Sequence, residues 1–384
     1  MSFLDALSKP GGLHAVAEFK RRSPSAGGIR PGADVRAYAQ AYEAAGAAAM
    51  SVLVDARFDG SIDDLRAARE ATSLPLLAKG FFSGDAQLDE LRAAGADAAL
   101  LILRDLDDER AGALQAHARR LGLDVLVEAH DANELERAVR LGADPIGLNA
   151  RDLGTFTIDR RAQLELVAAA PRDRIVIAES AIASRAQAAA AELAGADAVL
   201  VGTALMRARD PAAALRGLVS RPLVKVCGLT RQEDVAAAVD AGADLCGFIL
   251  VDESPRASRR VLAVPDEVLS VGVYVGEAGA QGDLQQLYER AEGRVRGRDA
   301  ILLRRGEKVA AVVDLPWGED DPSHLERART ADGRVMLAGG LGPENVRAAI
   351  EAVHPWAVDA SSSLEREPGV KDHDRVRAFV EAAR

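Results

Sequence analysis

The chain has 384 residues, an apolar fraction of 48% and a formal net charge of −11, from 48 basic and 59 acidic side chains. This length is typical of two domains or one very large one, and the acidic balance argues against nucleic acid as a bulk partner while leaving small anions open. The chain shows no apolar run near the roughly 20 residues that span a bilayer, no signal-peptide pattern and only two cysteines. We therefore expect a cytoplasmic protein with no membrane partner and no disulfide scaffold.

The first half of the chain predicts eight strands, each followed by a helix. A Gly-Ala-Asp phrase ahead of an apolar run recurs about every 50 residues, at 94–103, 141–149, 194–202 and 241–250. Each glycine is expected to end a helix, and the run after it to form a strand buried on both faces. In chain order the predicted strands are AVAEFK, MSVLVD, PLLAKG, AALLIL, DVLVEA, PIGLNA, RIVIAES and AVLVGTAL. Eight such units in about 200 residues predict a closed (β/α)8 barrel rather than a doubly wound open sheet.

The second half repeats this pattern with one strand fewer. Its seven predicted strands are LVKVCG, LCGFILV, VGVYV, DAILL, VAAVVDL, RVMLAGG and WAVDASS. The predicted domains are residues 1–216 and 217–384. Because a closed barrel cannot lose one unit without re-registering its hydrogen bonds, the second barrel must lack or remodel one βα unit. The predicted fold is therefore α/β, with two tandem (β/α)8 TIM-type barrels of which the second is altered.

Charged side chains gather at the predicted strand ends of the first barrel. Two lysines and three glutamates follow apolar strands there: Glu18, Lys20, Lys79, Glu128 and Glu179. Strand ends of such a barrel meet at one face, and burying an unpaired charge costs several kcal/mol. Structural ion pairs are the alternative, but the number of charges favours an active site, and lysine with glutamate suits general acid–base chemistry.

Glycine and hydroxyl residues predict a phosphate site at the same face. Ser23 opens a Ser-Pro-Ser-Ala-Gly-Gly loop, Ser180 follows the seventh strand, and Gly202 with Thr203 follows the eighth. Loops after strands seven and eight hold phosphate on backbone amides in many barrels.

Six segments of the first half resemble indole-3-glycerol phosphate synthase: EFKRRSPSAGG, LLAKGFF, VLVEAHD, IGLNARDLGTF, IAESAI and VGTALM. Their order and spacing match across residues 3–215. The resemblance implies that a carboxyphenylamino-deoxyribulose phosphate closes to an indole with loss of carbon dioxide and water. It also implies that Lys79 is the general acid of ring closure and that Glu128 is the base or acid partner in dehydration. Lys20, held by Glu18, would bind the substrate carboxylate and assist proton transfer.

The same resemblance assigns the remaining residues of the first site. Asn149 and Glu179 would orient the hydroxyls and the ring, and the substrate or its phosphate would be held by Ser23, Arg151, Ser180, Gly202 and Thr203. Two residues depart from the family pattern: Gly80 stands where an aspartate is usual, and Ala181 stands where a glycine is usual. The family also carries a longer N-terminal helical extension, so we expect a reduced cover over the substrate.

Four segments of the second half resemble phosphoribosylanthranilate isomerase: LVKVCGLTR, GFILVDESPRASRR, LAGGLGPENV and VDASSSLEREPGVKD. The resemblance implies an Amadori rearrangement in which Cys227 is the base, Asp314 the acid and Arg256 the ligand of the anthranilate carboxylate. The phosphate would be held by Gly339, Gly340, Ser361 and Ser362. The family's Gln-Leu-His-Gly strand and its glycine-rich loop after the acid are absent, so we expect ligand binding with slow or no isomerisation.

The sequence thus predicts an enzyme of tryptophan biosynthesis that acts on small phosphorylated substrates. The first barrel is the synthase, and the second either adds isomerase activity, binds a phosphorylated ligand without turnover, or packs as a structural relic. No metal site is predicted, because the six histidines show no ligand spacing with carboxylates or cysteines. No dinucleotide fingerprint or other cofactor motif is found, and the oligomeric state is left open.

Overall fold

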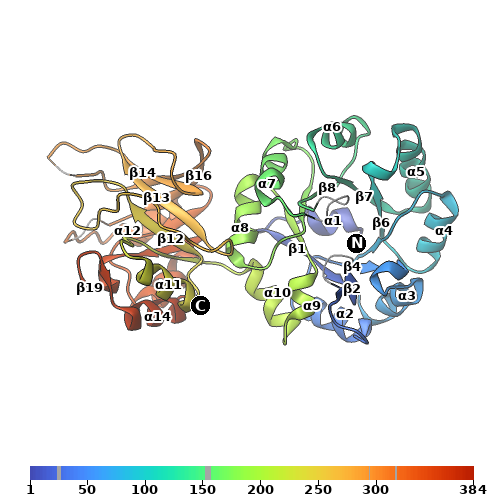
Figure 1. Cartoon of the computed structure of the whole chain (residues 1–384), viewed down its shortest axis with the longest axis horizontal. Coiled ribbons are helices and arrows are strands. Elements are labelled where there is room, and N and C mark those ends of the chain that lie inside the picture. The colour runs from blue at the N-terminus through green and yellow to red at the C-terminus, as the bar shows by residue number, and fades with distance from the viewer. Residues whose placement is uncertain (24–26, 152–156, 294, 316–317) are drawn as a thin grey trace. The chain divides into compact units, whose positions relative to one another are not determined.

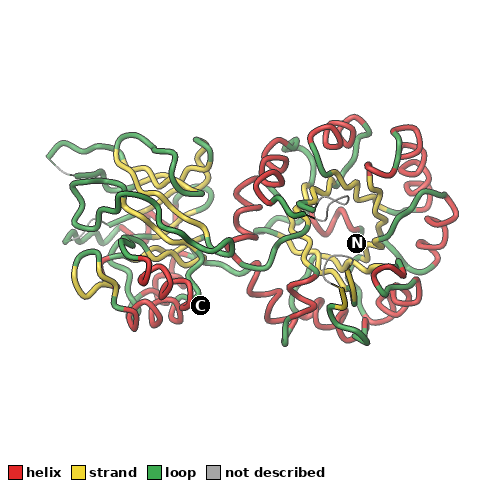
Figure 2. The backbone as a smooth tube through the Cα atoms, viewed as in Figure 1, coloured by secondary structure: helices red, strands yellow, loops and turns green. Residues whose placement is uncertain are grey.

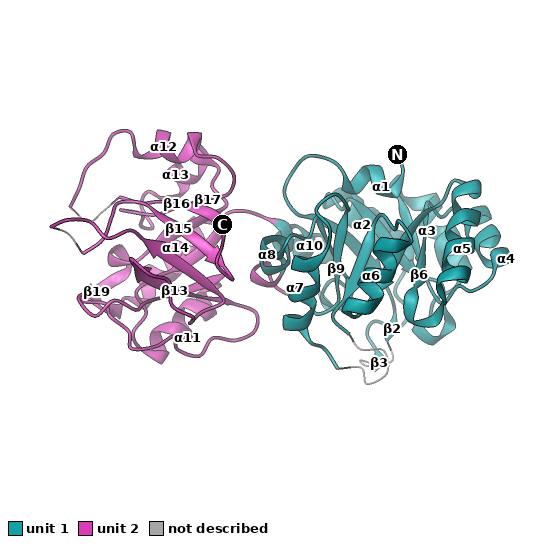
Figure 3. Ribbon diagram, turned by 90° about the horizontal axis from the view of Figure 1, so that it is seen from above, with its two compact units in different colours: residues 1–183, 188–219 teal, residues 184–187, 220–384 magenta. Residues whose placement is uncertain are grey.

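The computed structural model describes residues 1–23, 27–151, 157–293, 295–315 and 318–384. The chain divides into two compact units, residues 1–183 with 188–219 and residues 184–187 with 220–384 (Figure 3). Each unit is built around its own closed barrel of strands.

Unit 1 is a closed barrel whose eight strands in the described residues are all parallel, as the sequence predicted. The strands form a ring with most of the helices outside it, and a short helix near the N-terminus is seen within the ring (Figure 2). The barrel strands are β1(His14–Phe19), β4(Ala49–Leu53), β5(Leu76–Lys79), β6(Ala98–Ile102), β7(Asp124–Ala129), β8(Ile146–Asn149), β9(Val176–Glu179) and β10(Ala198–Val201). A short hairpin of β2(Arg22–Ser23) and β3(Gly27–Gly28) follows β1.

The helices of unit 1 alternate with these strands, beginning with a short N-terminal one (Figure 1). They are α1(Phe3–Leu7), α2(Val35–Ala44), α3(Ile62–Ala71), α4(Asp85–Ala93), α5(Asp108–Leu121), α6(Ala132–Arg140), α7(Arg160–Ala169), α8(Arg185–Ala194), α9(Thr203–Arg207) and α10(Pro211–Val219). Polar N-caps such as Ser61, Asp107 and Asp131 start several of them by accepting backbone N–H groups. The repeated phrase also acts as expected, because its glycines have positive φ just past the helices: Gly46, Gly95, Gly142, Gly195 and Gly242.

The core of unit 1 has two layers. An outer layer fills the space between strands and helices. An inner layer inside the barrel includes Val16, Leu77, Leu126 and Leu200, and Phe3 of α1 packs against it. The charged strand ends come two residues after inner side chains such as Val16, Leu77 and Leu126 and so point to the same side of the strand, with the apolar layer beneath them.

Unit 2 also closes with eight strands within the described residues, which corrects the count of seven. They are β11(Leu223–Val226), β12(Leu245–Ile249), β13(Leu269–Val275), β14(Leu284–Tyr288), β15(Ala300–Arg304), β16(Glu307–Val313), β17(Val335–Leu337) and β18(Ala357–Ala360). The helices described in this unit are α11(Gln232–Ala241), α12(His324–Thr330), α13(Val346–Val353) and α14(His373–Ala382). A hairpin of β19(Glu365–Glu367) and β20(Val370–Lys371) follows β18.

The remodelled unit lies between β13 and β16, as the sequence indicated. The strand missed was β14, which pairs parallel with β13, while β15 pairs antiparallel with both β14 and β16. A two-residue turn at Arg305 (φ 53°) and Gly306 (φ 82°) joins β15 to β16, and this pair of positive φ values is the hairpin form that suits strand twist. Because β15 is reversed, the connections from β14 to β15 and from β15 to β16 need no helical crossover.

Candidate active sites

Lys79 is the centre of the charged cluster in the first barrel. Its Nζ lies 2.5 Å from Glu179 Oε2, 3.5 Å from Glu128 Oε2 and 3.8 Å from Glu18 Oε2. The four side chains come from β5, β9, β7 and β1, and none is more than 10% exposed. Lys20, a second ammonium, pairs with Glu18. The structure thus brings together all five charged residues that the sequence selected.

The environments of these groups push their pKa values in opposite directions. Burial alone would raise the pKa of Glu128, but the charges of Lys79 and His130 hold it well below its usual range. Burial raises the pKa of Glu179, and the Glu128 charge adds to this against the pull of Lys79. Burial would lower the pKa of Lys79, yet the three carboxylates keep it above its ordinary value. Lys20 and Lys79 likewise lower the pKa of Glu18 against its burial, so the cluster holds two ionised carboxylates, one carboxyl that keeps its proton more readily, and a protonated lysine.

His130 and Glu134 extend the cluster, and sequence reasoning missed both. His130 Nε2 lies 3.2 Å from Glu128 Oε1, and its Nδ1 lies 3.0 Å from Glu134 Oε2. The signal was present in the VLVEAHD segment, where a histidine follows the strand-end glutamate by two residues.

Two glycines allow the glutamates their positions. A Cβ at Gly202 would lie 2.2 Å from Glu18 Oε1, and one at Gly147 would lie 2.2 Å from Glu179 Oε1. Gly202 was predicted as part of a phosphate loop. In the structure its lack of a side chain also leaves space for the Glu18 carboxylate. Gly147 was not predicted, because its need depends on a side chain from the neighbouring strand β9.

The predicted binding residues lie around this cluster. Ser23 is buried in β2, and Asn149 at the end of β8 accepts from the backbone N–H of Arg151 at 3.0 Å. Thr203 begins α9 directly after Gly202. Parts of two predicted segments, residues 24–26 and 152–156, lie outside the described residues.

Ser180 and Ala181 have left-handed backbone conformations, with φ values of 68° and 56°. The departure from the family pattern at Ala181 therefore falls where an L-residue with a Cβ is strained and glycine is not. This loop follows β9 directly after Glu179.

Cys227 and Lys225 share one face of β11, as predicted. A Cβ at Gly247 would lie 2.7 Å from Cys227 Sγ and 2.9 Å from Lys225 Cε. Lys225 is fully buried and donates to Asp359 Oδ2 at 2.8 Å and to Gln286 Oε1 at 2.6 Å. Burial raises the pKa of the free Cys227 thiol, and the Lys225 ammonium opposes that rise.

Asp314, the predicted acid, follows β16 and is buried. Its Oδ2 accepts from Tyr288 Oη at 2.7 Å and lies 2.8 Å from Arg296 Nη2. The Arg296 guanidinium lies over the Tyr288 ring, 4.1 Å from its centroid. Asp359 is buried and interacts electrostatically with both Asp314 and Cys227, the predicted acid and base.

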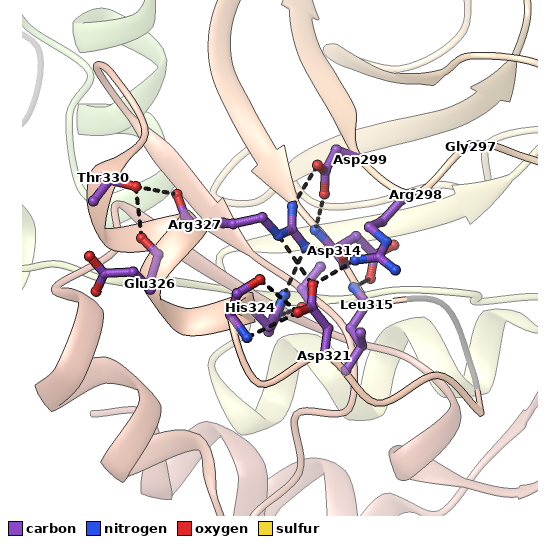
Figure 4. Close-up of polar contacts among 12 residues, drawn as sticks. Gly297, Arg298, Asp299, Asp314, Leu315, Asp321, His324, Glu326, Arg327 and Thr330 are labelled. Atoms are coloured by element: carbon purple, nitrogen blue, oxygen red, sulfur yellow. Dashed lines mark hydrogen bonds and ion pairs between the residues drawn. The ribbon is translucent and has the colours of Figure 1, made fainter.

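The backbone of Asp314 is held by an ionic network (Figure 4). Its N–H donates to Asp299 Oδ1 at 3.0 Å, and Arg327 Nη1 donates to Asp299 Oδ2 at 2.7 Å. Arg298 joins the network through Asp321 at 2.6 Å. Tyr288, Arg296 and Asp299 all come from the remodelled segment, and sequence reasoning missed them.

The predicted ligand-binding residues of the second barrel fall into two groups. Arg256 Nε donates to Glu365 at 2.8 Å, and a Cβ at Gly228 would lie 2.7 Å from Ser361 Oγ and 3.1 Å from Arg256 Cδ. Arg256 and Ser361 therefore flank the backbone just after Cys227. Gly339 and Gly340 have φ values of 85° and 67° after β17, and Ser362 begins a short 3-10 turn after β18. Residues 316–317, beyond the acid, lie outside the described residues.

Within the described ranges, no group of three or more His, Cys, Asp or Glu side chains could hold a metal ion. Among the helices of the described residues, none is long and apolar enough to cross a membrane.

Two family models match this chain. One is described as indole-3-glycerol phosphate synthase and covers residues 1–218, and the other as N-(5′-phosphoribosyl)anthranilate (PRA) isomerase and covers residues 319–382. The second match begins after β16, beyond the segment whose topology is altered.

Curated relatives cover one or both units. The tryptophan biosynthesis protein TrpCF of Yersinia pestis is 35% identical over 96% of this chain and 84% of its own length. An indole-3-glycerol phosphate synthase of Rhizorhabdus wittichii is 47% identical over 56% of this chain and 83% of its own. A multifunctional tryptophan biosynthesis protein of Phanerodontia chrysosporium is 31% identical over 96% of this chain, which spans only 63% of that protein.

Among solved structures, a phosphoribosyl anthranilate isomerase in complex with reduced 1-(o-carboxyphenylamino)-1-deoxyribulose 5-phosphate is 29% identical. It covers 42% of this chain and 98% of its own, with a TM-score of 0.33.

Proposed function

The chain belongs to the indole-3-glycerol phosphate synthase family and carries a PRA isomerase domain in its C-terminal half, and from this premise we propose how each barrel acts. It is an enzyme of tryptophan biosynthesis with a lyase and an isomerase domain, acting on phosphorylated intermediates of that pathway. Our proposal assigns the synthase to residues 1–216 and the isomerase to residues 217–384. The individual substrates and the residue roles are part of the proposal.

In the proposed synthase reaction, Lys79 is the general acid. The substrate is the carboxyphenylamino-deoxyribulose phosphate, whose carboxylate-bearing ring carbon bonds to the ketone carbon as Lys79 gives a proton to the ketone oxygen. Carbon dioxide then leaves, and its bonding electrons restore the aromatic ring. The observation that carries this role is the position of Lys79 among three buried carboxylates, which keep it protonated until the ketone oxygen needs its proton.

Glu128 completes the proposed reaction as the base. The hydroxyl takes a proton from Lys20 and leaves as water while Glu128 takes a proton from the intermediate, which yields the indole. The lowered pKa of Glu128 supports the role of base over that of acid, a choice that the sequence left open. Glu179 and Asn149 orient the substrate, and Lys20 binds its carboxylate, in the roles implied by the family.

In the proposed isomerase reaction, Asp314 protonates the ribose ring oxygen and the ring opens to an iminium. Cys227 then takes the C2′ proton, and the resulting enol becomes the ketone. Arg296 Nη2 must release Asp314 Oδ2 before that oxygen carries a proton, because a guanidinium only donates. The hydrogen bonds that run from Lys225, beside Cys227, through Gln286 and Tyr288 to Asp314 support turnover over a relic or a non-catalytic binding module.

The experiment measures both reactions at steady state on one purified chain, with Lys79→Met and Cys227→Ala as variants. Each variant should lose roughly 10²–10⁴-fold in its own reaction, which is the usual contribution of a positioned acid or base. Each should leave the other reaction unchanged and so serves as the other's folding control. Normal indole formation by a folded Lys79→Met chain would refute the synthase assignment. An isomerase rate unaffected by Cys227→Ala would refute the role of Cys227 as the base. No isomerase activity in the unmodified chain would leave the second barrel as a binding or structural module.

The proposed partners are small phosphorylated substrates, with no nucleic acid and no cofactor. The cytoplasmic location expected from the sequence stays a prediction.

A further inference from the structure

His130 lies between two carboxylates at the edge of the synthase site. Its Nε2 faces Glu128 Oε1 at 3.2 Å and its Nδ1 faces Glu134 Oε2 at 3.0 Å, and its side chain is only 2% exposed. The proposed reaction uses Glu128 and gives His130 no task.

The start of α6 sets the orientation of this histidine (Figure 1). Asp131 caps the helix and accepts from the N–H of Glu134 at 2.8 Å. Glu134 Oε2 reaches back to the backbone N–H of His130 at 2.8 Å as well as to its ring, and Arg104 lies 3.6 Å from Glu134 Oε1. A carboxylate fixed by a helix cap thus holds one ring nitrogen, which directs the other towards Glu128.

The two oxygens of Glu128 are divided between two partners. Oε1 faces His130 at 3.2 Å, and Oε2 faces Lys79 at 3.5 Å. With Oε1 occupied, Oε2 is the oxygen directed at the proposed acid. The other acidic groups facing Glu128 are Glu18 on β1, which is ionised and cannot donate, and Glu179 on β9, whose raised pKa lets it donate to Glu128 while it keeps its proton.

The ring satisfies both carboxylates only when it carries both protons. An imidazolium donates from both nitrogens, whereas neutral imidazole donates from one. Burial would lower the pKa of His130, but hydrogen bonds to Glu128 and Glu134 raise it to about 9. Both contacts are therefore present at neutral pH and one is lost as the pH rises through about 9.

We propose that His130 is a positioning residue of the synthase, which holds Glu128 Oε1 so that Oε2 faces Lys79 and the substrate. The inference rests on the proposed role of Glu128 as the base. His130 acts through Glu128 and touches no reacting atom.

The experiment compares His130→Gln with His117→Gln in the full chain. His117 on α5 is a matched control, because its ring also contacts a carboxylate, Asp89 Oδ1 at 2.8 Å, but away from the proposed site. We expect His130→Gln to lower kcat roughly 10–100-fold, the cost of removing a group that orients a ligand or base. KM should stay within about threefold, because the lost contact does not bind substrate. His117→Gln should match the unmodified chain.

The pH profile separates positioning from a purely structural role. The unmodified enzyme should lose kcat as the pH rises through about 9, the pKa of His130, and this step should vanish in His130→Gln. Deprotonation of Glu179 also lowers kcat at alkaline pH, in the unmodified chain and in His130→Gln alike. The diagnostic feature is therefore the step near pH 9 that is present in the unmodified chain and missing in His130→Gln. A folded His130→Gln enzyme that keeps the step, whatever its kcat, overturns the proposal.

Two further variants keep the test decisive. Should His130→Gln fail to fold, Glu134→Gln carries the test: it removes one anionic partner, so the alkaline step should move to lower pH, and an unmoved step overturns the proposal. Glu128→Gln tests the premise by itself. If that variant keeps normal turnover, the proposed base is wrong; if it is inactive while His130→Gln is normal, only the inference about His130 fails.

Discussion

Glu128 and Glu179 show how one chemical group takes two roles through its surroundings. Both are buried carboxyls on neighbouring sides of Lys79, but of the two only Glu128 has the His130 ring beside it, at 3.2 Å. The His130 cation adds to the charge of Lys79 in lowering the pKa of Glu128. Burial and the Glu128 charge raise the pKa of Glu179. A single histidine on one side of the cluster thus helps to separate the pKa values of two buried carboxyls.

We expect Glu128→Gln to reduce indole formation roughly 10²–10⁴-fold while substrate affinity is kept, because the amide cannot accept a proton as a base does. Steady-state kinetics of the synthase reaction check this, with isomerase activity of the same chain as the folding control. If affinity falls and kcat is normal, Glu128 is a binding residue and the assignment is wrong.

Ala181 offers a stability test of the loop after β9. Its φ of 56° costs an L-residue about 1–2 kcal/mol, while a glycine loses roughly 0.5–1 kcal/mol more chain entropy on folding. Ala181→Gly should therefore stabilise unit 1 by about 0.5–1 kcal/mol.

Thermal unfolding followed by loss of synthase activity measures the effect of Ala181→Gly. The matched control is Ala116→Gly at an exposed position inside α5, where glycine should destabilise by about 1 kcal/mol. A lower midpoint for Ala181→Gly, or the same shift in both variants, would show that the left-handed backbone stores no strain.

At the scale of elements, the first barrel was predictable because one local signal repeats. Helix-ending glycines and doubly buried runs such as AALLIL identify strands without knowledge of their neighbours. The charged residues ending those strands, such as Lys79 and Glu179, could be grouped because parallel strands end at one face. Gly147 could not be predicted, since its need arises from a side chain on another strand.

The remodelled segment of the second barrel could not be predicted in the same way. β14 contains Gln285 and Gln286 and lacks a flanking helix, so it fits no strand–helix repeat. Gln286 is buried because it accepts from Lys225 on β11, which local sequence does not reveal. The turn after β15 has arginine where asparagine or aspartate usually signals a hairpin. The positions of Tyr288 and Arg296 follow from β14 and its pairing with β13 and β15. Because that strand was not predicted, neither were their contacts with Asp314.

Tyr288→Phe tests whether the remodelled strand serves the isomerase. The substitution removes the hydroxyl that donates to Asp314 Oδ2 at 2.7 Å and accepts from Gln286 Nε2 at 2.7 Å. Isomerase kcat should fall by about tenfold, equivalent to the roughly 1.4 kcal/mol of one hydrogen bond to a charged group. Synthase activity on the same chain should not change.

The control for Tyr288→Phe is the same substitution one strand away. Tyr274 on β13 bonds through its hydroxyl to the backbone of Gln281 at 3.0 Å and contacts neither Cys227 nor Asp314 in the described residues. Tyr274→Phe should leave isomerase turnover unchanged. Equal losses in both variants would point to general destabilisation of the barrel rather than to the acid.

At the scale of the whole molecule, the two barrels place opposite demands on pH. In the synthase site, Glu179 and His130 both keep their protons more readily than usual. Burial raises the pKa of Glu179, and Glu128 and Glu134 raise that of His130 to about 9. The proposed isomerase base works only after losing its proton, and burial raises the pKa of the Cys227 thiol above its ordinary value. One chain therefore carries an active site that needs protonated groups and another that needs a thiolate.

We expect the two activities of one preparation to diverge as the pH rises from 7 towards 9.5. Synthase kcat should fall, since groups with raised pKa values lose protons in that window. Isomerase kcat/KM should not fall with it, because the growing thiolate fraction of Cys227 offsets the loss of the proton that Asp314 must carry. Cys227→Ala should abolish the isomerase activity and leave the falling synthase profile intact, with circular dichroism at each pH confirming that the chain stays folded. Profiles that rise or fall together would mean that Cys227 is not the base, or that unfolding rather than titration governs both sites.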